Sequence, residues 1–276
     1  MSSVQEAARL LAGIPGWQGR AAELSPLAGA GQRRSFLVTA GDERCVLRLA
    51  GRAASGRGMA GELTVHARAA KAGIAPRIRH ADPARGLLLT DYVAGTAWTE
   101  ADLEDPGSLA ELAVLLRRLH ALPPCGIPYD ARAAAEAYLA ALRAAGPVPA
   151  LAGTCRRIIV EHAPCARPAC CHNDLVAQNV VRGTALQLID FEYAGDNEPL
   201  FDLAGLAGWH ELDDARAGWL LDAWADGAGR ALRARFAAER RRFDAIQWLW
   251  LAARACDQPQ PADAARLERV AARLAG

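Results

Sequence analysis

Roughly the first 90 residues carry short apolar runs that predict a small antiparallel sheet. The runs are rich in branched and aliphatic side chains, which favour strands, and comprise residues 35–39, 44–49, 77–80 and 86–90. The turn Ala-Gly-Asp-Glu at residues 40–43 predicts a hairpin between the first two runs. Residues 61–72 have helical composition and end at Gly73, a residue typical of the position after a helix. This part of the chain is therefore expected to be a sheet with one main helix.

From residue 94 onward the pattern becomes helical. The expected helices are residues 109–119, with leucines recurring on one stripe, and the alanine-rich stretches 131–145, 213–227 and 231–253. Two short strand-like runs, residues 180–181 and 186–189, interrupt them and predict a hairpin. The expected fold class is α+β, with a small antiparallel-sheet lobe over residues 1–93 and a larger, mostly helical lobe over residues 94–276.

Composition narrows the class of protein. Of the 276 residues, 52% are hydrophobic and 23% charged, which supplies a core and gives no sign of disorder. The formal net charge of +1 excludes nucleic-acid binding driven by bulk charge. Apolar runs are too short to span a membrane, and Met1–Gly13 lacks the pattern of a signal peptide. Seven cysteines, an odd number, indicate reduced thiols. We expect a cytoplasmic protein without a membrane or nucleic-acid partner and without an obligate protein partner.

The segment that carries chemistry contains Asp174, Asn179 and Asp190. Asp174 and Asn179 lie five residues apart on a predicted loop, and Asp190 follows the predicted hairpin, which returns the chain to the same point. Phosphoryl transfer needs metal ions to neutralise phosphate charge and a carboxylate to orient and deprotonate the acceptor hydroxyl. Asn179 and Asp190 offer the hard oxygen ligands that Mg²⁺ prefers, which leaves Asp174 for the hydroxyl.

The motif H-N-D-x-x-x-x-N at residues 172–179, followed by I-D-F-E-Y at 189–193, resembles the choline/ethanolamine kinase family. That family belongs to the aminoglycoside phosphotransferase superfamily, which is similar in fold to protein kinases. The resemblance implies a bilobal kinase-like fold and an enzyme that uses ATP and Mg²⁺. It also implies that Asp174 is the catalytic base, that Asn179 and Asp190 bind the metal, and that His172 and Asp202 brace the loop.

Nucleotide contacts are expected from the sheet lobe. Protein kinases use a lysine on the third strand paired with a helix glutamate, but Lys71, the only lysine, lies at the end of a predicted helix. Arg48 occupies the strand position, where the choline kinase-like family is similar in having V-L-R-L, and Glu62 is its natural partner. The remaining expected nucleotide-binding residues are Gly29 and Gly31 in a phosphate-covering loop, and Asp91, Tyr92 and Val93 in a hinge at residues 90–93.

The acceptor is expected to be a cationic alcohol, with choline or ethanolamine favoured. Aromatic faces and carboxylates attract a quaternary ammonium group, and the predicted contacts are Glu192, Tyr193, Trp209, Glu211 and Trp250. The family typically has W-x-x-W on a helix, whereas Gln247-Trp248-Leu249-Trp250 stands here, so Trp248 and Trp250 point to different faces. Trp219 and Trp224 are expected to be core residues.

Other interpretations remain open at this point. The same fold could phosphorylate an aminoglycoside, thiamine or a sugar, or the chain could be a catalytically silent nucleotide-binding module. Cys165, Cys170, Cys171 and His172 do not have the spacing of a tetrahedral zinc site, and we predict no zinc there. The other five histidines, His66, His80, His120, His162 and His210, are expected to be surface or packing residues.

Overall fold

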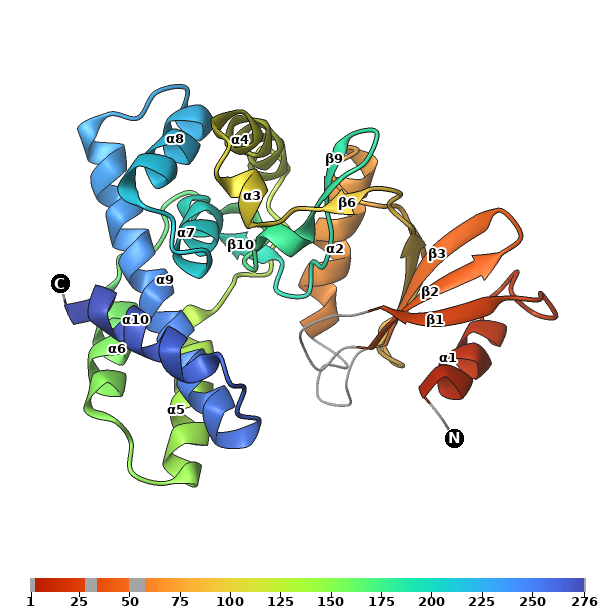
Figure 1. Cartoon of the computed structure of the whole chain (residues 1–276), viewed down its shortest axis with the longest axis horizontal. Helices are drawn as coiled ribbons and strands as arrows, with labels where there is room; N and C mark the ends of the chain where they lie inside the picture. Colours follow the sequence, from red (N-terminus) through yellow and green to blue (C-terminus); the bar gives the residue numbers. More distant parts are fainter. Residues whose placement is uncertain (1–2, 28–33, 50–57, 276) are drawn as a thin grey trace.

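The computed structural model describes residues 3–27, 34–49 and 58–275 (Figure 1). Its N-terminal part is a five-stranded antiparallel sheet with the strand order β1-β2-β3-β5-β4. The strands are β1 (Glu23–Leu27), β2 (Arg34–Ala40), β3 (Glu43–Leu49), β4 (Ile78–Asp82) and β5 (Leu87–Asp91). The sequence predicted all of these strands except β1, and the β2–β3 hairpin is confirmed.

The N-terminal part of the chain also contains two helices. The helix α1 (Ser3–Ala12), which the apolar pattern did not predict, packs Ala7 and Leu11 into the same cluster as Phe36 and Leu47 of the sheet. The helix α2 (Gly58–Lys71) is the predicted main helix, and it begins three residues earlier than expected. In Figure 1, α2 lies between the sheet and the helical part of the chain, and several of its residues are buried.

The C-terminal part is mostly helical. Its helices are α3 (Glu100–Leu103), α4 (Pro106–His120), α5 (Ala131–Ala145), α6 (Ala150–Glu161), the 3₁₀ turn η1 (Ala177–Asn179), α7 (Leu200–Trp209), α8 (Asp214–Ala225), α9 (Arg230–Asp257) and α10 (Asp263–Ala275). Short strands form two further sheets, namely β6 (Thr96–Ala97), β8 (Val180–Arg182) and β9 (Leu186–Leu188) in one, and β7 (Ala169–Cys171) with β10 (Gly195–Asn197) in the other. The predicted hairpin at residues 180–189 is the β8–β9 pair.

The core of the helical part is organised around α7, which is buried along almost its whole length. One apolar cluster joins α7 to α4 and α8, and a second joins α5, α6, α9 and α10. Trp224 packs against the first cluster as expected, but the prediction that Trp219 is a core residue is wrong, because its side chain is 45% exposed on α8. None of the helices in the described part of the chain has both the length and the apolar character needed to cross a membrane.

Candidate active site

Asp202, which is fully buried in α7, accepts hydrogen bonds from the loop that follows β7. One carboxylate oxygen accepts the backbone N–H of His172 at 2.8 Å and the Nε2–H of His120 at 3.0 Å, and the other accepts the backbone N–H of Asn173 at 2.7 Å. Burial acts to raise the pKa of Asp202, but the hydrogen bonds from the His120 side chain and the His172 backbone outweigh it and hold this pKa below its usual value. Asp202 therefore fixes the start of the loop as an ionised residue.

Asn173 ties the loop to the segment that follows Asp190. Its backbone is in the left-handed region, with φ of 62°, a conformation that asparagine tolerates better than most residues. Its Nδ2 donates to the carbonyl oxygen of Tyr193 at 3.0 Å, and its Oδ1 accepts from Asn197 at 2.8 Å. His172, also buried, donates from Nε2 to the carbonyl oxygen of Ile189 at 2.8 Å. These hydrogen bonds connect the loop at residues 172–173 to the segment at residues 189–197.

Asp174, Asn179 and Asp190 are brought to one place by the β8–β9 hairpin. The N–H of Ile189 donates to the carbonyl oxygen of Asn179 at 2.9 Å, so Asp190 follows directly after a residue bonded to Asn179. The Nδ2 of Asn179 donates to the carbonyl oxygen of Asp174 at 3.0 Å. Asp190, like Asn173, has a left-handed backbone, with φ of 64°, where the chain leaves the hairpin. The spacing in the sequence predicted this meeting.

The chemistry of these side chains suits a divalent cation and a base. The amide of Asn179 donates through nitrogen, which leaves its oxygen as an acceptor, and the Asp190 side chain is 39% exposed. Both are hard oxygen ligands that fit Mg²⁺. Burial raises the pKa of Asp174, the charges of Asp190 and Asp202 raise it further, and His172 acts in the opposite direction. A carboxylate whose pKa is raised is a better proton acceptor than an exposed one.

Arg48 links the sheet to this centre. It lies on β3, and its Nη1 is 3.6 Å from Oε1 of Glu62, a fully buried residue of α2. Its Nη2 donates to Oδ1 of Asp190. The pairing with Glu62 agrees with the sequence analysis, whereas the contact with Asp190 was not foreseen. One guanidinium group therefore joins α2 to the candidate metal ligand.

The other residues expected to bind nucleotide are only partly described. Gly29 and Gly31 lie outside the described residues. The Asp91 side chain pairs with Arg77 at 3.3 Å and with Arg79 of β4, and the centre of the Tyr92 ring lies 4.5 Å from the guanidinium of Arg44. The N–H groups of Asp91 and Tyr92 donate within the sheet. A role for this hinge in binding adenine would therefore depend on backbone carbonyl groups and on Val93.

The predicted acceptor residues Trp209, Glu211 and Trp250 lie together where α7, α9 and α10 meet. The two indole rings are 5.9 Å apart and inclined by 59°. The guanidinium of Arg266 lies 4.1 Å from the Trp209 ring, and that of Arg254 lies 4.0 Å from the Trp250 ring. The carboxylate of Glu211 accepts hydrogen bonds from Arg269 at 2.7 and 2.9 Å. Cations of the chain itself thus already contact these aromatic faces and this acid.

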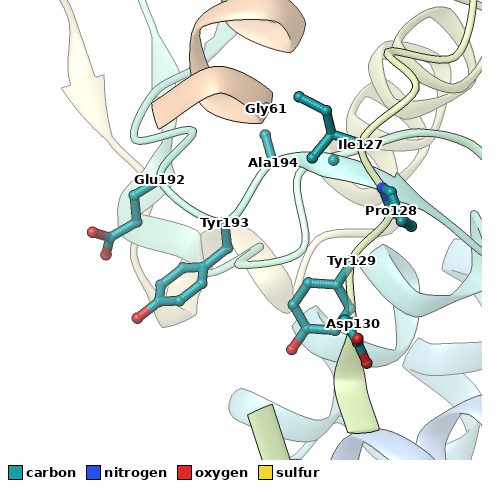
Figure 2. A pocket seen from close by; sticks show the side chains of 9 residues that line it. Gly61, Ile127, Pro128, Tyr129, Asp130, Glu192, Tyr193 and Ala194 are labelled. Carbon is teal, nitrogen blue, oxygen red and sulfur yellow. The ribbon is translucent and has the colours of Figure 1, made fainter. Parts of the chain in front are cut away.

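Glu192 and Tyr193 lie elsewhere, at a cavity of about 180 Å³ (Figure 2). We call it the tyrosine cavity; it is lined by Gly61, residues 127–130 and residues 192–195. The segment 127–129 is laced to β10 by the bonds from Asp196 N–H to Ile127 at 2.8 Å and from Tyr129 N–H to Asp196 at 2.9 Å. Tyr129 and Asp130 were missed by the sequence analysis because they belong to no motif and reach the cavity only through this long-range pairing.

Several histidines that the sequence left without partners have them, among them His120, His162 and His210. His120 bonds to Asp202, and its Nδ1 accepts from Trp224 at 3.0 Å. His210 accepts the Ala177 N–H at 2.9 Å and donates to Glu100, and His162 donates to Glu239 at 2.6 Å. His120 and His210 therefore support the two ends of the loop that contains Asp174.

Within the described residues, the ligand atoms of His120, Cys171 and Asp202 lie within 4.8 Å of one another, a grouping that the cysteine spacing did not suggest. Burial raises the pKa of Cys171 well above its usual value, and its thiol lies 3.6 Å from the Asn197 carbonyl oxygen. The hydrogen-bonding atoms of His120 and Asp202 are engaged as described above. In these contacts His120 and Asp202 hold the loop in place. The absence of zinc at residues 165–172 stays a prediction.

Comparisons with known proteins agree with this architecture. A sequence model of the phosphotransferase enzyme family matches residues 23–249. A choline/ethanolamine kinase family protein from Mesorhizobium loti is similar in structure at 29% sequence identity, with a TM-score of 0.77 and with 98% of this chain and 93% of that chain covered. The choline kinase LicA from Streptococcus pneumoniae shares the fold at 17% identity, with a TM-score of 0.73 and coverage of 92% and 93%.

Among curated proteins, Protein LicA of Haemophilus influenzae is 34% identical over 74 residues. This match spans 26% of the present chain and only 28% of the length of that relative. The family match, in contrast, extends from the edge strand β1 into α9. The chain therefore belongs to the phosphotransferase enzyme family and has the protein kinase-like fold that the choline and ethanolamine kinases also have.

Proposed function

We propose that the chain transfers the γ-phosphoryl group of ATP, bound with Mg²⁺, to the hydroxyl group of a small cationic alcohol, with choline or ethanolamine favoured. The observation that carries the proposal is the meeting of Asp174, Asn179 and Asp190 across the Asn179–Ile189 backbone bond. The relative at 29% identity is described as a choline/ethanolamine kinase family protein, and a related LicA structure contains AMP. Both descriptions support the proposed substrates.

Each residue has a distinct part in the proposed reaction. Asp174 orients the acceptor hydroxyl and accepts its proton as the oxygen attacks the γ-phosphorus in line with the leaving ADP. Arg48, held by Glu62, donates to phosphate oxygens, which its planar guanidinium can contact at two points. Asn179 and Asp190 would hold Mg²⁺, which supplies positive charge against the phosphate oxygens. Transfer is direct, so no phosphoenzyme forms.

An acceptor panel tests the proposal. Purified protein is incubated with Mg·ATP and choline, ethanolamine, thiamine, a sugar or an aminoglycoside, and ADP release and ³¹P spectra are recorded. We expect acceptor-dependent ADP release with choline or ethanolamine, and a rate lowered by about 10²–10⁴-fold in Asp174→Asn. Turnover of an aminoglycoside in place of amino alcohols would correct the acceptor. Absence of transfer to every alcohol, with nucleotide binding intact, would support the silent module instead.

A further inference from the structure

The hydrogen bond from the N–H of Ala177 to Nε2 of His210, at 2.9 Å, joins the turn η1 to the residue that follows α7. We propose that His210 is a positioning residue for Asn179, and that the C-terminal helix α10 holds His210 in place through the residues on either side of it. These residues, Trp209 and Glu211, then have a role other than contact with the acceptor. The inference rests on the proposed function, because it concerns a proposed metal ligand of that same reaction.

The turn η1 carries Asn179, and His210 bonds to the first residue of that turn. η1 comprises only Ala177–Asn179, and the N–H of Asn179 donates back to the carbonyl oxygen of Val176 at 3.0 Å. A turn this short has few hydrogen bonds of its own, so a bond to its first N–H fixes much of its orientation. Ala177 is fully buried, and a buried N–H that loses its acceptor is unfavourable. The orientation of Asn179 therefore depends on His210.

The protonation of the His210 ring suits this bond. Its Nδ1 lies 2.8 Å from Oε1 of Glu100 in α3, and its side chain is buried. Nδ1 therefore carries the proton and donates to Glu100, while Nε2 accepts from Ala177. Burial lowers the pKa of His210 more than Glu100 raises it, and the charge of Arg266 lowers it as well. The ring is therefore neutral at neutral pH, with its acceptor nitrogen on the side of η1.

The helix α10 contacts the residues on both sides of His210. The guanidinium of Arg266 lies 4.1 Å from the centre of the Trp209 ring, and the Nε–H of Arg269 donates to both carboxylate oxygens of Glu211 at 2.7 and 2.9 Å. Glu211 has a left-handed backbone, with φ of 52°, which is uncommon for a residue other than glycine. Such a conformation persists where surrounding contacts hold it, and the pair with Arg269 is one of these contacts. α10 thus fixes the chain where it presents His210 to η1.

The helix α10 is itself anchored to its neighbours. Arg273 donates to Oδ1 of the buried Asp244 in α9 at 2.7 Å, and to the carbonyl oxygen of Gly208, in the last turn of α7, at 3.3 Å. The buried residues of α10 belong to the same apolar cluster as those of α9. The family model matches residues 23–249, which end before α10 begins. The support for His210 therefore comes from a helix outside the part of the chain that matches the family.

Exchange of the Ala177 amide proton, followed by NMR, tests the contact without any substrate. His210→Phe keeps a ring of similar size without an acceptor, whereas His210→Gln can place its Oε1 where Nε2 now accepts. We expect exchange about 10-fold faster than in the wild type for His210→Phe, and near the wild-type rate for His210→Gln. His162→Phe, which removes the histidine bonded to Glu239, is the control. Equal exchange in the two His210 variants would contradict the positioning role.

The support from α10 is tested by breaking one ion pair. Arg269→Gln removes the charge that holds Glu211, and Arg156→Gln, which breaks the similarly exposed pair with Glu136 at 2.6 Å, is the matched control. We expect Arg269→Gln to weaken Mn²⁺ binding about 2–5-fold, with the KM for choline unchanged, and Arg156→Gln to change neither. A changed KM for choline with unchanged Mn²⁺ binding would return Glu211 to the acceptor site.

Mn²⁺ binding is measured by EPR, in the presence of a non-hydrolysable ATP analogue. We expect His210→Phe to weaken it about 10-fold, the lower end of what loss of a residue that supports a metal ligand costs, and His210→Gln to bind as the wild type does. These results would support the inference even if no alcohol is phosphorylated. Choline turnover with equal Mn²⁺ binding in the wild type and His210→Phe would overturn the inference and leave the proposed function standing. A wild type that binds no Mn²⁺ would overturn the inference together with the role of Asn179.

Discussion

His66 on α2 stacks on Phe191, the residue that directly follows Asp190, with ring centroids 4.9 Å apart and ring planes inclined by 29°. The ring of His172 is a second neighbour of Phe191, with ring centroids 4.8 Å apart. All three side chains are buried. Each histidine donates from Nε2 to a carbonyl oxygen, His66 to Pro76 and His172 to Ile189, both at 2.8 Å. Phe191 is therefore clamped between α2 and the loop that contains Asp174, and the position of Asp190 depends on that clamp.

Loss of the His66 ring should lower both stability and turnover. We expect His66→Ala to reduce the free energy of unfolding by about 2–4 kcal/mol, because it leaves a cavity and an unpaired carbonyl group at Pro76. It should also lower kcat, with a smaller change in the KM for ATP, because Asp190 is displaced. His66→Phe keeps the stack and should recover most of kcat. Leu116→Ala, a buried change in α4, is the control for destabilisation alone; an equal fall in its kcat would contradict the clamp.

The same histidine makes stability dependent on pH. Burial lowers the pKa of His66 to about 4, against an ordinary value of 6.5. Below about pH 6.5 the unfolded chain takes up a proton that the folded chain does not, so the folded state loses stability as the pH falls toward 4. The full loss for this shift is about 3 kcal/mol. His210, whose pKa is also lowered by burial, acts in the same direction.

Urea denaturation at pH 7.5 and pH 5 measures this effect. The wild type should lose more stability between the two pH values than His66→Phe, whose ring does not titrate. Equal losses in the two proteins would show that His66 is protonated in the folded state.

Arg48→Lys keeps the positive charge but not the fork that contacts Glu62 and Asp190 together. A lysine ammonium is a single point charge on a flexible stem, so one of the two contacts is lost. We expect the KM for ATP to rise about 10–100-fold, corresponding to one charge-assisted hydrogen bond. The acceptor KM should be unchanged. Steady-state kinetics with each substrate varied in turn checks both, and an unchanged KM for ATP would remove Arg48 from the nucleotide site.

Asp174→Asn should separate activity from stability. Loss of the general base is expected to lower kcat by about 10²–10⁴-fold with nucleotide affinity retained. Because burial and the neighbouring carboxylates raise the pKa of Asp174, its charge is unfavourable in the folded state at neutral pH. The neutral amide should therefore leave the melting temperature equal or higher. A fall in melting temperature together with kcat would indicate a structural role for Asp174.

The sequence predicted that Asp174, Asn179 and Asp190 meet because these residues are close in the chain. Asp174 and Asn179 lie on one loop, and one short hairpin brings Asp190 back to Asn179. Contacts between residues far apart in the chain produce no comparable pattern in the sequence. Tyr129 reaches the cavity through its bond to Asp196, and Asp202 is reached by His120 from α4.

Burial removes the amphipathic pattern of α7, one of the helices that the sequence analysis did not predict. In α7 both faces are buried, so its apolar residues show no stripe. The strand β1 is mostly exposed and contains Pro26. Proline is tolerated in a strand at the edge of a sheet, where β1 lies, but its presence argues against a strand when only the sequence pattern is considered. By contrast α5, with one buried face and a cap at Asp130, has the bounds that the sequence predicted. The division into lobes at residues 90–93 stays a prediction.

Gly61 sets the distance between α2 and the cavity wall. A Cβ atom at Gly61 would lie 2.7 Å from the carbonyl oxygen of Ala194, closer than real contacts allow, so Gly61→Ala must push the helix and the wall apart. Alanine favours a helix over glycine by about 1 kcal/mol, and the clash should more than offset this gain. Gly153→Ala on α6 has no heavy atom within 4 Å of the new methyl group and is the matched control. We expect a lower melting temperature and a higher acceptor KM for Gly61→Ala, and a slightly higher melting temperature with unchanged kinetics for Gly153→Ala. Equal kinetics in the two variants would show that the separation of α2 from residues 192–195 does not matter for acceptor binding.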